Sequence, residues 1–227
     1  MMRIQIAVLF VLFSTATTFS QSLSRVTSGI DVGLGYQDKT WVPSAVYHQE
    51  LSLTNFPYFR VGWGVRAWGY YAGRTNLVPK SSAFSDDTLK YGRLSANGAS
   101  FLFGANFRLW KFDIGANTDI VGFAFGVKRH GLYDKSKLFE GEGAPYYNSY
   151  VPSNPSAFNV LPLVIDKQNG QSEVYIRYWI TDRIGLKLAY VHGRITYSTS
   201  EKLDNGQRRF SKTYGVPSAS ISFPLYN

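Results

Sequence analysis

The stretch that decides the fold reads Phe59-Arg-Val-Gly-Trp-Gly-Val-Arg-Ala-Trp68. Every second residue, from Phe59 to Ala67, is apolar, whereas the residues between them are arginine or glycine until Trp68. Because successive side chains of a β-strand point to opposite faces, this pattern predicts a strand with one apolar face and one polar face. Arg60 and Arg66 then share the polar face.

The same two-residue period recurs along the chain, and it predicts eight strands in all. The other seven predicted strands are residues 29–36, 45–53, 99–109, 112–120, 174–180, 184–190 and 218–225. Beyond the fifth strand, Phe123 and Phe125 have the opposite parity to Phe112 and Ile114. This change predicts either a β-bulge near residues 119–121 or a strand that leaves the membrane there.

The connections between these strands alternate in length. Residues 54–57, 110–111 and 181–183 are tight turns, while residues 74–91, 128–170 and 200–212 are longer polar stretches. The first connection on the same side as the long stretches, residues 38–41, is an exception and is short. Short turns on one side and long loops on the other are typical of bacterial outer-membrane barrels. The sequence therefore predicts an all-β fold, an eight-stranded antiparallel up-and-down transmembrane β-barrel with both ends in the periplasm.

The first residues predict export. Arg3 precedes an apolar run from Ile4 to Phe13, followed by small and hydroxyl residues. This is the pattern of a secretory signal peptide, and the run is too short for a membrane-spanning helix. We therefore expect a signal peptide at residues 1–20, an outer-membrane β-barrel domain at residues 21–227, and a location in the cell outer membrane.

The composition narrows the class of protein further. The chain has 16 Phe, 16 Tyr, 5 Trp and 21 Gly but no Cys, so strands are favoured and disulfides are excluded. Lys and Arg outnumber Asp and Glu by 24 to 15. An exported chain with this positive charge meets anionic membrane lipids. We therefore expect lipids, and not nucleic acid, as its partner.

A soluble lipocalin-like carrier of apolar ligands remains an alternative, because it also has eight strands in which apolar and polar residues alternate. An eight-stranded barrel has an interior just wide enough for side chains. Bulky aromatic residues would crowd that interior, whereas on the outside they form a lipid-facing band ending in residues such as Tyr36, Tyr178 and Tyr190. The sequence therefore favours the membrane barrel.

The polar faces carry a balanced set of charges, five acids and five bases. They are Asp31, Glu50, Arg60, Arg66, Arg108, Asp113, Asp119, Glu173, Arg177 and Lys187. An unpaired buried ion is costly, so the balance predicts paired charges in the lumen. A salt-bridged plug is favoured over an ion path, because wide channels need more strands.

The tract from Gln171 to Tyr190, QSEVYIRYWITDRIGLKLAY, resembles two strands of small outer-membrane β-barrel proteins of Bacteroidota, of the OmpA-barrel or OmpW type. The stretch from Phe59 to Tyr71 is similar to a third strand of such proteins. The resemblance implies an outer-membrane location and the barrel-assembly machinery as a partner. It implies no activity, because such folds carry many functions.

The sequence contains no clear catalytic or metal-binding pattern. The three histidines are His48, His130 and His192, and no nucleophile is placed beside any of them by the sequence. No His, Asp and Glu cluster has the spacing of metal ligands. We expect no catalytic residues, metal or cofactor; a lipid A-modifying enzyme, acting from the outer end of the barrel, is the alternative.

Two of the long loops are candidates for surface contacts. The last one is basic, with Lys202, Arg208, Arg209 and Lys212. These residues form either a solvated loop tip, which is the favoured interpretation, or a contact for lipopolysaccharide phosphates. The loop at residues 128–170 contains six aromatic residues between Tyr133 and Phe158, too many for a plain disordered linker. The function we expect is structural or surface-interacting, in a monomer whose partners are outer-membrane lipids and lipopolysaccharide.

Overall fold

The computed structural model describes residues 26–53, 55–79, 87–134, 145–161, 164 and 168–226. The expected signal peptide lies outside these residues. The described part of the chain contains no helix long and apolar enough to span a bilayer. It forms one antiparallel sheet of thirteen strands, which confirms the all-β, antiparallel prediction.

The strands differ greatly in length. The eight long ones are β1 (Val26–Gln37), β2 (Thr40–Leu53), β3 (Phe56–Ala72), β6 (Leu94–Leu109), β7 (Phe112–Phe125), β11 (Gly170–Thr181), β12 (Ile184–Thr199) and β13 (Arg209–Tyr226). The five short ones are β4 (Thr75–Pro79), β5 (Thr88–Tyr91), β8 (Arg129–Asp134), β9 (Tyr150–Pro155) and β10 (Phe158–Val160). The predicted count of eight is therefore wrong, because stretches expected as polar loops form five further strands.

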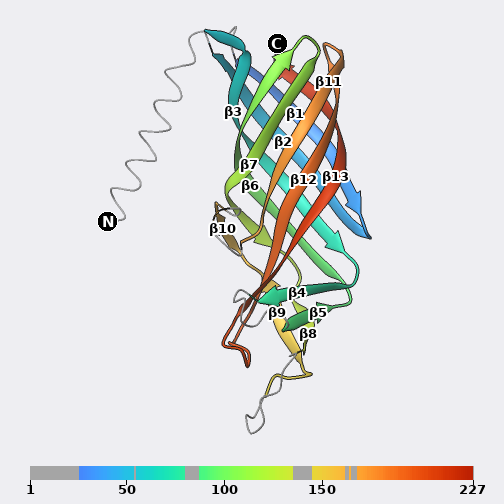
Figure 1. Cartoon of the computed structure of the whole chain (residues 1–227), viewed down its shortest axis with the longest axis vertical. Coiled ribbons are helices and arrows are strands. Elements are labelled where there is room, and N and C mark those ends of the chain that lie inside the picture. The colour runs from blue at the N-terminus through green and yellow to red at the C-terminus, as the bar shows by residue number, and fades with distance from the viewer. Residues whose placement is uncertain are drawn as a thin grey trace, which may run out of the picture.

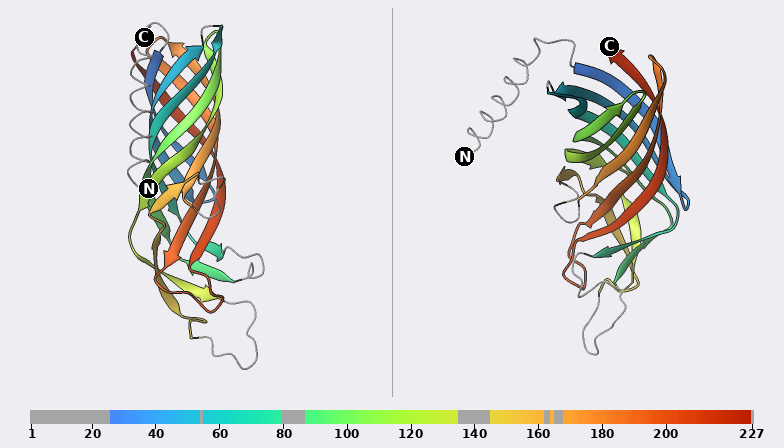
Figure 2. Two further views of the ribbon diagram at one scale, coloured as in Figure 1. Left: turned by 90° about the vertical axis from the view of Figure 1, so that its left-hand side faces the viewer. Right: turned by 45° about the horizontal axis from the view of Figure 1, so that its top comes forward.

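The long strands pair in a closed cycle. Each pairs with the next in the order β1, β2, β3, β6, β7, β11, β12 and β13, and β13 pairs back with β1. Figures 1 and 2 show the resulting tube of tilted strands. Because the cycle is closed, every long strand has a hydrogen-bonded neighbour on both sides over much of its length.

The two ends of the tube are built differently. Tight turns, such as residues 110–111 and 182–183, gather at the end where the chain's C-terminus lies, at the top of Figure 1. We call this the turn end. The short strands β4, β5, β8 and β9 lie beyond the opposite end, which we call the loop end. The alternation of short and long connections thus separates the two ends as expected.

One interruption in β7 changes which residues face inward. Phe101 of β6 pairs with Val121 of β7, but the next residue, Leu102, pairs with Asp119, so Ile120 is an extra residue. The bulge predicted near residues 119–121 is confirmed. It allows Asp119 to face the interior while Val121, Phe123 and Phe125 beyond it face outward, and these three are exposed.

A second closed cycle lies beyond the loop end and shares two strands with the first. It runs β12, β9, β8, β5, β4 and β13, and β13 pairs back with β12. We call this six-stranded part the distal extension. It consists of the four short strands and the parts of β12 and β13 near Tyr197 and Phe210.

An apolar core fills the distal extension and the neighbouring part of the tube. Its most buried members are Tyr70, Leu77, Leu89, Leu94, Tyr133, Ile195, Tyr197 and Phe210. The Tyr133 hydroxyl donates to the buried carboxylate of Asp87 at 3.0 Å, and Asn205 Nδ2 donates to the same carboxylate oxygen. Burial, together with the nearby Asp87 carboxylate, raises the pKa of Tyr133 above its ordinary value.

The outer and inner faces of the tube have opposite chemistry. Apolar side chains at alternate positions point outward and are exposed, among them Val32, Ile176 and Leu188 at 52%, 51% and 57%. The residues between them point into the tube and are mostly polar or charged. This is the inverse of a soluble protein, in which apolar side chains are buried.

Candidate functional site

The interior of the tube between the turn end and the apolar core holds the charges expected from the sequence. Nine of the ten are buried, and Arg108, near the turn end, is the partly exposed one with 29% of its side chain accessible. They come from seven of the eight long strands; β13 contributes the buried Ser220 and Ser222 instead. Closure of the cycle is what brings these strands together.

Arg177 of β11 is the centre of this group. Its guanidinium lies 3.0 Å from a carboxylate oxygen of Asp31, 3.3 Å from Asp113 and 3.4 Å from Glu50. The same guanidinium lies over the rings of Tyr175 and Trp179. One buried cation therefore compensates three buried carboxylates from three different strands.

Lys187 of β12 continues the network toward the loop end. Its ammonium group lies 3.0 Å from Asp31 and forms a second ion pair with Glu173. It also lies 4.4 Å from the centre of the Tyr175 ring, within the range of a cation–π contact. Lys187 thus links the carboxylates of β1 and β11.

Arg66 of β3 forms the next link. It donates to Asp119 at 2.7 Å and to the backbone carbonyl of Gln171 at 3.3 Å, and it hydrogen-bonds Asn117. Glu173 lies 3.7 Å away. Seven charges therefore alternate in sign in one connected chain, in the order Asp113, Arg177, Asp31, Lys187, Glu173, Arg66 and Asp119.

The other two predicted arginines differ in how well they are bound. Arg108 forms a two-pronged contact with Asp113, at 2.6 and 2.8 Å, and Trp179 donates to the same carboxylate at 2.7 Å. Arg60 has one ion pair, 3.7 Å from Glu50, and its Nε and Nη1 atoms are buried without a hydrogen-bond partner in the described part of the chain. Among these arginines, Arg60 therefore has the weakest ion pairing and hydrogen bonding.

This difference makes a prediction about stability. Arg66→Ala leaves Asp119 and Glu173 with less compensation, so we expect a loss of about 3–5 kcal/mol in the free energy of unfolding. Arg60→Ala removes a long ion pair and two unsatisfied donors, so we expect a loss below about 2 kcal/mol. Urea unfolding of the two refolded variants measures both values; equal losses would contradict the ranking.

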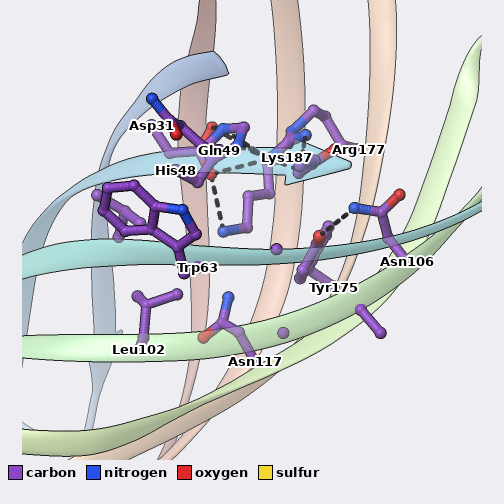
Figure 3. A pocket seen from close by; sticks show the side chains of 15 residues that line it. Asp31, His48, Gln49, Trp63, Leu102, Asn106, Asn117, Tyr175, Arg177 and Lys187 are labelled. Carbon is purple, nitrogen blue, oxygen red and sulfur yellow. Dashed lines mark hydrogen bonds and ion pairs between the residues drawn. The ribbon is translucent and has the colours of Figure 1, made fainter. Parts of the chain in front are cut away.

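His48 belongs to the same group, although the predicted set of ten lumen charges does not include it. Its imidazole lies 3.1 Å from Glu50 and 3.6 Å from Asp31 (Figure 3). Its parity in the sequence predicts this inward position, because His48 shares the inward face of its strand with Glu50. A charged His48 would be held by two carboxylates at once.

Neutral side chains complete the cluster. Asn117 donates to Glu173 at 2.6 Å. Asn106 donates to the Tyr175 hydroxyl at 3.3 Å, as Figure 3 shows. The cavity among these residues measures about 20 Å³, the space of about one water molecule. A larger hollow of about 250 Å³ at the turn end reaches His48 and Arg177.

The four basic residues predicted for the last loop are divided between a turn and a strand. Lys202 and Arg208 lie in the turn after β12, but Arg209 and Lys212 belong to β13, which corrects the predicted loop. Arg208 donates to the backbone carbonyl of Ser200. All four are exposed, and Lys212 lies beside another hollow of the surface, away from the turn.

The structure adds one feature near His192, where an enzyme would need a nucleophile. Strand register places Ser172 of β11 opposite His192, and the Ser172 hydroxyl is hydrogen-bonded to that of Thr118 at 2.6 Å. Among the described residues, no group of three or more His, Cys, Asp or Glu side chains is arranged to hold a metal ion.

Comparisons with known proteins give distant likenesses. No protein-family model and no curated protein matches the chain. Among solved structures, neisserial surface protein A is 12% identical with a TM-score of 0.33, over 87% of this chain and 94% of that one. A major outer membrane protein from Thermus thermophilus is 9% identical with a TM-score of 0.39, over 88% and 99%. These likenesses are too weak to assign a family.

Proposed function

We propose that the protein is a monomeric transmembrane β-barrel of a Gram-negative outer membrane, with the eight long strands as its wall and the turn end in the periplasm. The observation that carries the proposal is the inverted distribution of side chains on the long strands. Exposed Val, Leu, Ile and Phe cover the outside, while the charges are inside. In water such an exterior would aggregate, whereas in a bilayer it is the surface that lipid tails contact.

Aromatic residues at the two margins of this apolar surface support a membrane position. Tyr36 and Trp41 pack on each other near the loop end, with ring centres 4.4 Å apart. Tyr58, Trp110 and Tyr178 lie near the turn end and are exposed. Aromatic girdles at both interfaces are typical of outer-membrane barrels.

The same distribution weighs against a soluble carrier. A lipocalin-like protein needs an apolar pocket inside its barrel. The interior of this tube holds charged side chains with a cavity of about 20 Å³ among them. Recovery of the protein as a soluble periplasmic monomer, instead of with the outer membrane, would overturn the membrane assignment.

Within that location, the role we propose is structural: a closed barrel that anchors the distal extension at the cell surface. The connected ion pairs fill the interior in the membrane, and the apolar core fills it beyond the loop end. From the described residues we infer that these two layers leave no continuous water-filled path of the kind that a porin needs. Exposure of the extension to the outside makes it the part that partners can contact.

This role predicts that the barrel does not conduct. In planar lipid bilayers, we expect the refolded protein to produce no discrete current steps under conditions in which a general porin produces them. The physical reason is that ions would have to separate buried ion pairs and cross an apolar core. Regular, reproducible steps that scale with protein concentration would contradict the closed interior.

The proposal includes no enzymatic activity, cofactor or metal. The outward-facing pair of His192 and Ser172 is the one observation that favours a lipid A-modifying enzyme instead, although the serine hydroxyl is bonded to Thr118. Mass spectrometry of lipid A from cells with and without the gene separates the two. An altered acylation or phosphate pattern would support the enzyme.

A further inference from the structure

A hollow of about 610 Å³ opens in the wall of the tube at the loop end. Three separate segments line it: the turn between β1 and β2, the junction of β3 with β4, and residues 212–216 of β13. Its volume is in the range of small-molecule binding sites. None of the contacts that define the interior charge cluster involves this hollow.

The hollow exists because the β1–β2 hairpin is shorter than its neighbours. β13 pairs with β1 only as far as Ser218, and with β4 only through Phe210 and Ser211. In the described pairings, residues 212–217 therefore have no strand partner on this edge. Among the described residues, no strand covers their backbone N–H and C=O groups on that side.

The turn that forms one wall is held in an unusual conformation. Asp38 and Lys39 both have positive φ, 49° and 61°, where glycine or asparagine is usual. The backbone carbonyl of Lys39 accepts a hydrogen bond from Gly73 N at 3.4 Å, which ties the turn to the end of β3. The geometry fixes Lys39 at the rim of the hollow.

The charge around the hollow is positive. Each of the three lining segments contributes one exposed cation, Lys39, Arg74 and Lys212, and the lining contains one acid, Asp38. Thr40, Thr75 and Thr213 add hydroxyl groups to the lining, whereas the Tyr214 hydroxyl is hydrogen-bonded to Gln171. Cations suit phosphate oxygens and the hydroxyls suit a sugar, so the lining matches a phosphorylated sugar.

The position of the hollow indicates where such a group would come from. Tyr36 and Trp41, which flank the hairpin turn, and Tyr71, which precedes Gly73, are exposed on the outer face. In the proposed membrane position these aromatic residues mark the interface, so the hollow lies at the level of lipid headgroups. A free phosphorylated sugar would have no reason to collect at this level.

We propose that this hollow binds the phosphorylated sugar headgroup of an outer-leaflet glycolipid, with Lys39, Arg74 and Lys212 contacting its phosphate. The proposal rests on the outer-membrane location proposed above. It moves lipid contact from the basic turn at Lys202 and Arg208 to a concave site built from three segments. Lys212 is the residue that the two predictions share.

Native mass spectrometry of the detergent-solubilised full chain with diphosphoryl lipid A tests the proposal. The wild type is expected to bind one lipid, and the K39Q/R74Q/K212Q variant to bind it about tenfold more weakly or worse, because three ionic contacts are lost. The matched control is K202Q/R208Q/R209Q, which removes the same number of charges elsewhere. The control should bind as the wild type does.

Two further arms use the wild-type protein and do not depend on the variants folding. Dephosphorylated lipid A should bind about tenfold more weakly, and inorganic phosphate should not displace the lipid at equal concentration. Equal binding by the K39Q/R74Q/K212Q variant, an equal loss in the control, or displacement by inorganic phosphate would overturn the site. Fractionation and heat-modifiable migration report separately on the outer-membrane proposal.

Discussion

Replacing Arg177 with alanine is expected to lower the free energy of unfolding by about 3–5 kcal/mol, the range for breaking a buried ion pair by removing one partner. The change would leave Asp31, Glu50 and Asp113 facing one another without the guanidinium that lies between them. Urea unfolding of the refolded protein, followed by tryptophan fluorescence and by migration on unheated gels, measures the loss.

Two further variants make this result specific. Arg183→Ala removes an exposed arginine from the neighbouring turn and should change stability by less than about 0.5 kcal/mol. Adding Glu50→Gln to Arg177→Ala removes one of the orphaned carboxylates, so part of the loss should be recovered. If Arg177→Ala behaves like Arg183→Ala, the interior cluster does not stabilise the barrel.

Leu89→Ala is expected to open the distal extension while leaving the barrel folded. Leu89 lies in the apolar core and is fully buried, so its truncation should cost about 2–5 kcal/mol. That cost falls on the extension, because the two closed cycles share only β12 and β13. Limited proteolysis should then cleave the variant within the extension, while heat-modifiable migration persists.

Val78→Ala is the matched control for this variant. Val78 lies on β4 in the same extension, but its side chain points outward and is 41% exposed. Proteolysis of this control should match that of the wild type. Loss of heat-modifiable migration in Leu89→Ala would show instead that the extension and the barrel unfold as one unit.

The sequence alone was sufficient to predict the strand face on which each interior charge lies. Alternation in a strand is a local property, so the parity of Asp31 or Arg177 can be read from its immediate neighbours. It does not say which acid meets which base. Asp31 and Arg177 are 146 positions apart and meet because the cycle closes with a particular tilt, a property of the whole sheet.

The distal extension was missed for a related reason. Its strands β4, β5, β8 and β9 are four to six residues long, too short for a convincing alternation. Leu77, Leu89 and Tyr133 come from separate stretches, and each lies in an apolar run of one or two residues within a polar loop. The unusual number of aromatic residues between Tyr133 and Phe158 was the available signal.

The hollow at the loop end could not be predicted at all from the pattern of the sequence. Lys39, Arg74 and Lys212 are far apart in the chain, and only Lys212 belongs to a basic cluster in the sequence. Their proximity depends on one hairpin being shorter than its neighbours. The basic loop predicted at residues 200–212 was recognised because its four charges lie within eleven residues of one another.

The hairpin formed by β12 and β13 belongs to both closed cycles, and this has a consequence for how the molecule assembles. Neither cycle can close until these last two strands are in place, because β13 pairs with β1 in one and with β4 in the other. Contacts between residues so distant in sequence form slowly. The barrel and its extension should therefore become protease-resistant in one late kinetic step, set by the arrival of the C-terminal hairpin.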